Sequence, residues 1–218
     1  MIPERFRGVW QRVSLSVDGG PWCEPAQVIW VQTGTVFGDI RLPFPGRTDE
    51  HPAMSFAGTL EWRDPHLSWN HKLDLYGDPD SDDGGDTAEV SWHGGELVCQ
   101  GYFPRASRTV PYTEVWRRLS GSKGTCLSLV RADGHGVLAQ VGDHAITIVD
   151  DRHRGGPYRA CYRSRSDTGW AVSLTLGDGS ESLPPPPHEA AVSDAMVLDG
   201  RRWHVLEQVP ARPLAATA

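Results

Sequence analysis

The chain has 218 residues and a formal net charge of −7, with 39% hydrophobic and 22% charged residues. This composition is typical of a globular protein, and no apolar run approaches the ~20 residues needed to cross a bilayer. The negative charge, without a block of lysines and arginines, argues against a nucleic-acid partner. Because residues 1–7 are not followed by an apolar segment, we expect no secretory signal, no membrane partner and a cytoplasmic protein.

Alternating polar and apolar runs, separated by Gly, Pro and Asp clusters, dominate the sequence. Long segments with a period of 3.6 are missing, so the pattern predicts an all-β protein with little helix. Eight antiparallel strands are enough to close a barrel around one small ligand. The first half contains eight such runs, at residues 8–17, 27–32, 36–41, 54–62, 67–75, 87–92, 96–103 and 112–119.

A small flexible segment at residues 120–124 marks a boundary between two domains. We therefore predict a barrel with a ligand pocket over residues 1–120, a second, smaller β-barrel over residues 121–209 and a disordered tail at 210–218. The four consecutive prolines at 184–187 predict an extended surface spacer, with a short helix after them at 188–193. The strands expected in the second half are residues 125–131, 136–141, 144–150, 158–165, 170–176, 196–198 and 202–207.

Two resemblances support a barrel. Gly8-Val9-Trp10, at the start of the first expected strand, is similar to the Gly-x-Trp signature of the lipocalins, which belong to the calycins. That resemblance implies an indole that plugs one end of the barrel beneath an arginine of the last strand, either Arg117 or Arg118.

The second resemblance rests on four motifs that occur in order along residues 8–119. Together they resemble the lipocalin-like family that includes the yeast casein-kinase-interacting protein. This resemblance implies two tandem lipocalin-like antiparallel β-barrels and says little about function. The motifs are Phe56-Ala57-Gly58, Trp69-Asn70-His71-Lys72-Leu73-Asp74, Asp83-Gly84-Gly85-Asp86 and Tyr112-Thr113-Glu114-Val115-Trp116-Arg117.

Besides Trp10, five of the nine tryptophans lie on expected strands of the first half, at positions 30, 62, 69, 92 and 116. Core filling is one interpretation of this concentration. A small barrel has room for only part of so much indole, however, and aromatic walls suit a flat or apolar ligand. We predict that Trp30, Trp62, Trp69 and Trp92 bind a small hydrophobic or aromatic ligand. Its orientation would be fixed by Asp39, Arg41, His71 and Glu114.

Acids and a base occur close to these tryptophans. His71, Asp74, Asp39 and Glu114 are the candidate catalytic residues, because desolvation in a barrel can adjust a carboxyl or imidazole for proton transfer near neutral pH. His71 and Asp74 have opposite strand parity and face the same side only if a bulge intervenes. The alternative interpretation is a structural network, in which Asp39 pairs with Arg41 on the same strand face.

Other chemistry is disfavoured. The acidic segment at residues 78–86 lacks the glycine and flanking helices of a calcium loop, and the histidines show no zinc spacing, so we predict no metal. Nucleophile-elbow, phosphate-loop and dinucleotide motifs are absent, so we expect no cofactor. The four cysteines have no Cys-x-x-Cys spacing and are expected to be buried thiols.

Three functions remain open. The leading hypothesis is binding of a small apolar or aromatic molecule in the first barrel. The rival is a cofactor-independent cyclase, isomerase or lyase that uses the same pocket and holds its substrate near a reactive shape. The third is a protein-interaction module that uses exposed sheet edges or the second barrel. The sequence carries no signal for oligomeric state.

Overall fold

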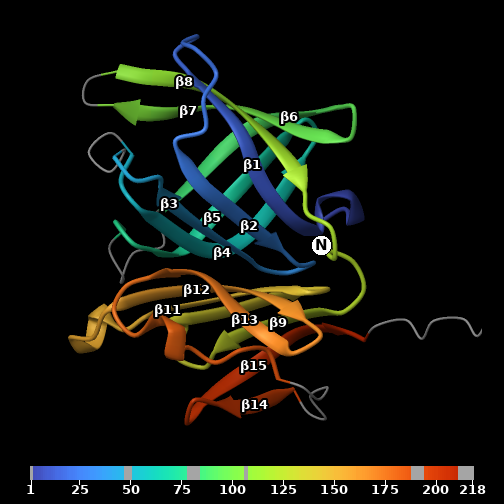
Figure 1. The fold of residues 1–218 in the computed structure, drawn as a ribbon, viewed down its shortest axis with the longest axis vertical. Helices are drawn as coiled ribbons and strands as arrows, with labels where there is room; N and C mark the ends of the chain where they lie inside the picture. Colours follow the sequence, from blue (N-terminus) through green and yellow to red (C-terminus); the bar gives the residue numbers. More distant parts are fainter. Residues whose placement is uncertain (1, 47–50, 78–83, 106–107, 188–193, 211–218) are drawn as a thin grey trace, which may run out of the picture.

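The computed structural model describes residues 2–46, 51–77, 84–105, 108–187 and 194–210. Strands dominate these residues, which confirms the all-β prediction (Figure 1). The helical segments found in them are three short 3₁₀ turns, none of which has the length or apolar character to cross a membrane. These turns are η1 (Glu4–Phe6), η2 (Arg152–Arg154) and η3 (Ser180–Ser182).

The first eight strands form a closed barrel in which each strand pairs antiparallel with the next and β8 returns to β1. Successive strands alternate in direction, so the odd-to-even connections lie at one end of the barrel and the even-to-odd connections at the other. We call the first the cavity end and the second the plugged end. The strands are β1 (Gly8–Val17), β2 (Ala26–Gln32), β3 (Phe37–Pro43), β4 (Met54–Arg63), β5 (His66–Asp74), β6 (Gly84–His93), β7 (Glu96–Arg105) and β8 (Arg108–Arg118).

Aromatic side chains fill the plugged end. The Trp10 indole Nε1 donates a hydrogen bond to the Phe6 carbonyl oxygen at 2.9 Å, which ties β1 to η1. The Phe6 ring packs against Trp62 and Trp92, with ring centroids 5.0 and 5.9 Å apart. The Arg118 guanidinium lies over the Trp10 ring at 4.3 Å, whereas Arg117 pairs with Glu96. Such cation–π contacts stabilise the closure.

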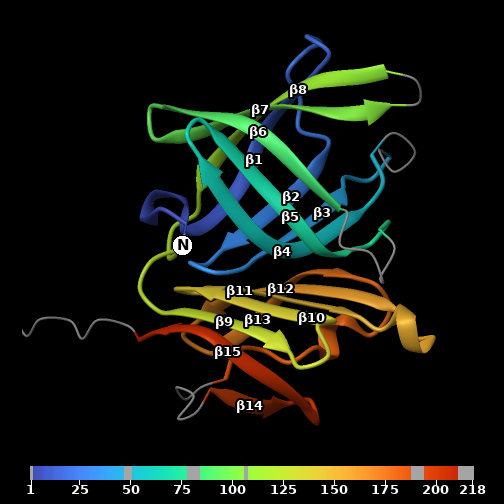
Figure 2. The same ribbon diagram turned by 180° about the vertical axis from the view of Figure 1, so that it is seen from behind.

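The second half is a seven-stranded antiparallel sheet that curls only partly (Figure 2). We expected a second barrel, but among the described strands no ladder joins the two ends of this sheet, β13 and β14. Its order is β13-β12-β11-β10-β9-β15-β14. The strands are β9 (Cys126–Arg131), β10 (Gly136–Val141), β11 (His144–Asp150), β12 (Tyr158–Ser166), β13 (Gly169–Leu176), β14 (Ala195–Leu198) and β15 (Arg201–Val209).

One face of this sheet packs against the outside of the barrel. Barrel residues such as Val31 and Ile40 share an apolar core with sheet residues such as Ile146 and Ile148. Gly38 permits the close approach, because a Cβ there would lie 2.6 Å from the Ile146 Cγ2 atom. Since the barrel covers one face and a smaller apolar core covers the other, the sheet buries apolar side chains without closing on itself.

A bulge in β5 decides which side chains face the barrel interior. Gly58 of β4 pairs with His71, whereas the preceding Ala57 pairs with Leu73, so Lys72 is the extra residue. Leu73 therefore packs toward the second sheet, while His71 stacks on the inward-facing ring of Phe56. The bulge brings Asp74 back to the side of His71, so the two side chains can meet although they have opposite strand parity.

The proline segment and the cysteines differ in part from what the sequence predicts. Pro184 and Pro186 are buried, and the Pro184 carbonyl oxygen accepts a hydrogen bond from Thr147, so this extended segment is not the surface spacer we expected. All four cysteines are free thiols; three are buried, and Cys23 is exposed. The predicted helix at 188–193 and nearly all of the predicted disordered tail lie outside the described residues.

Candidate functional site

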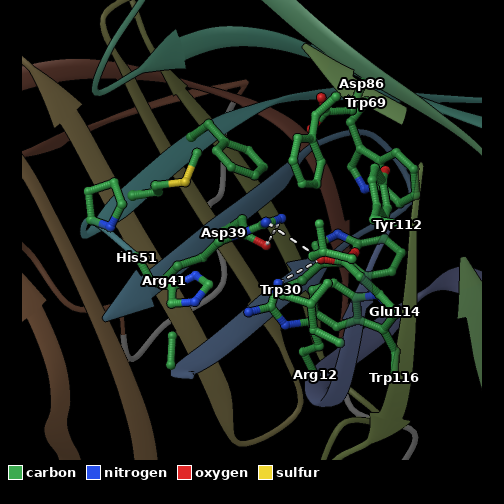
Figure 3. Close-up of a pocket in the computed structure, with 17 residues that line it drawn as sticks. Arg12, Trp30, Asp39, Arg41, His51, Trp69, Asp86, Tyr112, Glu114 and Trp116 are labelled. Atoms are coloured by element: carbon green, nitrogen blue, oxygen red, sulfur yellow. Dashed lines mark hydrogen bonds and ion pairs between the residues drawn. The ribbon is translucent and has the colours of Figure 1, made fainter. Parts of the chain in front are cut away.

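A cavity of about 350 Å³ lies inside the barrel, toward the cavity end (Figure 3). Its lining comes from strands all around the barrel and from the segment that precedes β4. The lining residues are Arg12, Leu15, Val17, Ala26, Trp30, Asp39, Arg41, His51, Pro52, Met54, Phe56, Trp69, Asp86, Phe103, Tyr112, Glu114 and Trp116.

Two arginines and three carboxylates form a buried network on one side of the cavity. Arg12 donates to both Glu24 carboxylate oxygens, at 2.9 and 3.0 Å, and to the Glu114 Oε1 atom at 2.7 Å. Arg41 donates to Asp39 at 2.8 Å, and its Nη1 atom lies 3.7 Å from the same Glu114 oxygen. Glu114 therefore links the two guanidinium groups, and these charge-assisted contacts fix their orientation.

Burial shifts the ionisation of this network. Desolvation raises the pKa of the Asp39 carboxyl above its ordinary value, although the Arg41 guanidinium pulls it down. Burial lowers the pKa of Arg41, but the charges of Asp39 and Glu114 more than offset this effect and raise it overall. The pKa of the Tyr112 hydroxyl is raised by burial and by the nearby Glu114 charge, so Tyr112 stays protonated at neutral pH.

Three tryptophans from different strands form the aromatic floor. Trp30 contacts Trp69 and Trp116 edge-on, with ring centroids 5.5 and 5.7 Å apart. The Trp30 indole Nε1 donates to Gln32 at 3.2 Å. The Trp116 Nε1 atom is buried and has no hydrogen-bond partner within the described part of the chain. A buried donor without an acceptor costs free energy.

His71 and Asp74 meet, but they do not line the cavity. The His71 Nδ1 atom lies 2.9 Å from an Asp74 oxygen, and its ring stacks on Phe56 at 4.1 Å, so Phe56 separates it from the cavity. Burial raises the pKa of Asp74, but hydrogen bonds from His71 and the backbone of Tyr76 and Gly77 outweigh it and hold the pKa below its ordinary value. The His71 Nε2 atom lies 3.8 Å from Asp86, which does line the cavity.

The structure thus gathers five of the nine predicted site residues around one cavity: Trp30, Asp39, Arg41, Trp69 and Glu114. Their predicted catalytic or ligand-binding roles remain predictions. Trp62 and Trp92 are not in the lining, because their positions on β4 and β6 place them at the plugged end. His71, which stacks on Phe56, and Asp74 are not in the lining either.

Sequence reasoning missed other lining residues, notably Arg12, Phe56, Asp86, Tyr112 and Trp116. A signal for some of them was present. Tyr112, Glu114 and Trp116 are spaced two apart on β8 and share one face, as Trp10 and Arg12 do at the start of β1. Because Glu114 was already predicted to face the interior, Tyr112 and Trp116, two residues away on either side, could have been predicted to face it as well. For a metal, no group of three or more His, Cys, Asp or Glu side chains is suitably placed within the described ranges.

The comparisons with known proteins identify a family and a fold. The fold matches the crystal structure of the uncharacterized protein YLR301w from Saccharomyces cerevisiae with a TM-score of 0.75. The match covers 92% of this chain and 98% of the yeast chain at 16% identity, so it supports the fold alone. No curated protein matches the sequence. The family model described as Protein HRI1 matches residues 8–207, and the chain therefore belongs to the HRI1 family.

Proposed function

We propose that the barrel binds a small, largely apolar or aromatic molecule in the cavity between Trp30, Trp69 and Trp116. The observation that carries this proposal is the cavity itself, about 350 Å³ of space inside a closed barrel. Protein cores seldom leave voids much larger than a water molecule, whereas ligand pockets have volumes of roughly 300–1,000 Å³. Large aromatic side chains beside a few fixed polar groups are the usual lining of such pockets.

A relationship to the lipocalins is part of this proposal. The plugged end, with Trp10 held between Phe6 and Arg118, supports it, because it closes one end of the barrel and leaves the ligand space at the other. Trp62 and Trp92 contribute to this plug. In the proposal they support the pocket indirectly, while the direct walls come from the three tryptophans of the floor.

Titration of the purified protein with N-phenyl-1-naphthylamine, a neutral probe whose fluorescence rises in apolar surroundings, tests the proposal. We expect saturable binding at one site per chain, with quenching of tryptophan emission. Absence of saturable binding by this probe and by other small aromatic compounds would contradict it.

Two matched variants on β4 localise the binding. Met54 lines the cavity and is partly buried, so Met54→Trp should fill the space and weaken probe binding at least tenfold. Leu60 is also partly buried on β4 but does not line the cavity, so Leu60→Trp should leave binding unchanged. Equal effects of the two variants would place the probe elsewhere.

A second candidate function is catalysis without a cofactor by the same cavity. The specific observation is a pair of buried carboxyl groups, Asp39 and Glu114, in contact with Arg41, where the pKa of Asp39 is raised by desolvation. A carboxyl with a raised pKa can give and take a proton nearer neutral pH. His71 and Asp74 are less suited to this role, because neither of them lines the cavity.

Mass spectrometry of a bound compound separates the two candidates. A compound altered by the wild-type protein and recovered unaltered from Asp39→Asn supports catalysis. Recovery of unaltered compounds from both proteins supports binding alone.

A further inference from the structure

The cavity holds more carboxylates than basic side chains. Glu24, Asp39, Asp86 and Glu114 lie in or directly behind its wall, against the two guanidinium groups of Arg12 and Arg41. With the imidazoles neutral, this leaves an excess of two negative charges, and protonation of Asp39 would still leave one. His51, which lines the cavity, and His71, beside Asp86, are the only other basic groups found here among the described residues.

Both arginines are already paired with carboxylates of the protein. The three guanidinium nitrogens of Arg12 all donate to Glu24 or Glu114. In Arg41, Nε and Nη2 donate to Asp39, and Nη1 faces Glu114 at 3.7 Å. A carboxylate or phosphate on a ligand would have to compete with these carboxylates for the guanidinium N–H groups and would be repelled by their charge, which is costly in a desolvated site.

Two carboxylates, in contrast, keep acceptor capacity toward the cavity. Both arginine contacts of Glu114 are made to Oε1, and Oε2 has no partner in the described part of the structure. Asp86 lines the cavity from β6 and has no arginine or lysine within ion-pair distance among the described residues. The His71 Nε2 atom lies 3.8 Å from its carboxylate. In Figure 3, Asp86 lies beside Trp69, and Glu114 lies near Tyr112.

The aromatic walls are suited to the same kind of ligand. The faces of Trp30, Trp69 and Trp116 carry the negative side of the ring quadrupole, which attracts a cation, most strongly for indole and more so in a desolvated site. The protein already uses this contact within the cavity, where the Arg41 guanidinium lies over the Phe56 ring at 4.8 Å.

We infer that the ligand of this cavity is an organic cation, an aromatic or apolar molecule that carries a protonated or quaternary amine. Its cationic group would lie between Asp86, Glu114 and the indole faces, while its hydrocarbon part fills the space toward Met54 and Phe103. The inference rests on the proposed function and narrows it to one charge class.

A set of three probes with the same ring tests the charge class. These are 1-naphthylmethylamine, which is protonated at pH 7, 1-naphthylmethanol and 1-naphthoate. We expect the amine to bind at least tenfold more tightly than the alcohol, and the carboxylate to bind least. Tighter binding of the alcohol or the carboxylate would overturn the inference and leave the proposed function standing. Failure of all three to bind would contradict the proposed function as well.

Asp86→Asn tests the position of the cationic group. We expect it to weaken binding of the amine threefold to tenfold and to leave binding of the alcohol unchanged, which also shows that the variant is folded. Asp18→Asn is the matched control, because its carboxylate has a similar exposure, 45% against 43%, but lies outside the cavity lining. Equal weakening of the amine by both variants, or no weakening by Asp86→Asn, would overturn the placement.

Discussion

Within the buried charge network, we expect removal of an arginine to cost more stability than removal of a carboxylate. Arg12 is only 6% exposed and serves both Glu24 and Glu114, so Arg12→Met removes a cation that two carboxylates share. Glu114 would then keep only Arg41 Nη1, at 3.7 Å. Removing one partner of a buried ion pair costs about 3–5 kcal/mol, because the other charge stays buried and unpaired. Methionine preserves much of the volume of the arginine stem, so the loss is mainly electrostatic.

Glu114→Gln should cost less. After this substitution Arg12 keeps both hydrogen bonds to Glu24 and Arg41 keeps Asp39, so no buried charge is left alone. The loss of charge-assisted contacts predicts a decrease of about 1–2 kcal/mol in the free energy of unfolding. The double variant should recover about 1–2 kcal/mol relative to Arg12→Met, because the unpaired carboxylate is gone.

Urea denaturation followed by tryptophan fluorescence measures all three values. The control is Arg117→Met, whose guanidinium pairs with Glu96 in an exposed position and should contribute less than about 1 kcal/mol. If Glu114→Gln costs as much as Arg12→Met, carboxylates are not in excess in this network, and the reasoning is wrong.

Three further predictions concern the fold around the cavity. Gly58→Ala would place a Cβ against the carbonyl oxygen of Asn70 at the β5 bulge, so it should lower the free energy of unfolding by at least about 2 kcal/mol in urea denaturation; a neutral effect would show that the bulge does not require glycine. Gly38→Ala should cost about 1–3 kcal/mol in the same assay, because its Cβ would meet Ile146 at 2.6 Å where barrel and sheet pack; an unchanged midpoint would contradict that close contact. Hydrogen bonds hold the pKa of Asp74 below its ordinary value, so its carboxylate stabilises the fold above about pH 4 and loses this effect as the pH falls through the lower folded value. Asp74→Asn should therefore cost about 1–2 kcal/mol at neutral pH and progressively less below about pH 4, and a deficit that grows in acid would refute this assignment.

Strand positions could be predicted from the sequence wherever turn residues flank an alternating run. Sheet closure, which depends on packing between distant segments, was predicted least well. Residues 136–141 and 144–150 are strands as expected, because glycine and aspartate delimit them. Eight antiparallel strands are enough to close a barrel, and the first eight strands do close. Whether the remaining strands close depends on what covers their faces, and the contact of residues such as Ile146 with the barrel has no local signal in the sequence.

The candidate site shows the same limit. Strand parity predicts which residues share a face, and Tyr112, Glu114 and Trp116 could have been found in this way. The bulge at Lys72 changes the parity of β5, and its trace in the sequence is a single glycine, Gly58, on the neighbouring strand. A tryptophan plugs the barrel or lines the cavity according to its position between the two ends of the barrel. The composition of the sequence does not reveal that position.

In the proposed function, the barrel holds a small ligand above its tryptophan floor. A crystal structure of the protein with 1-naphthylmethylamine tests this most directly. We predict density for one molecule against Trp30, Trp69 and Trp116, with its amine within hydrogen-bond distance of Asp86 or Glu114. A barrel interior filled by its own side chains, with no space for the probe, would contradict the account.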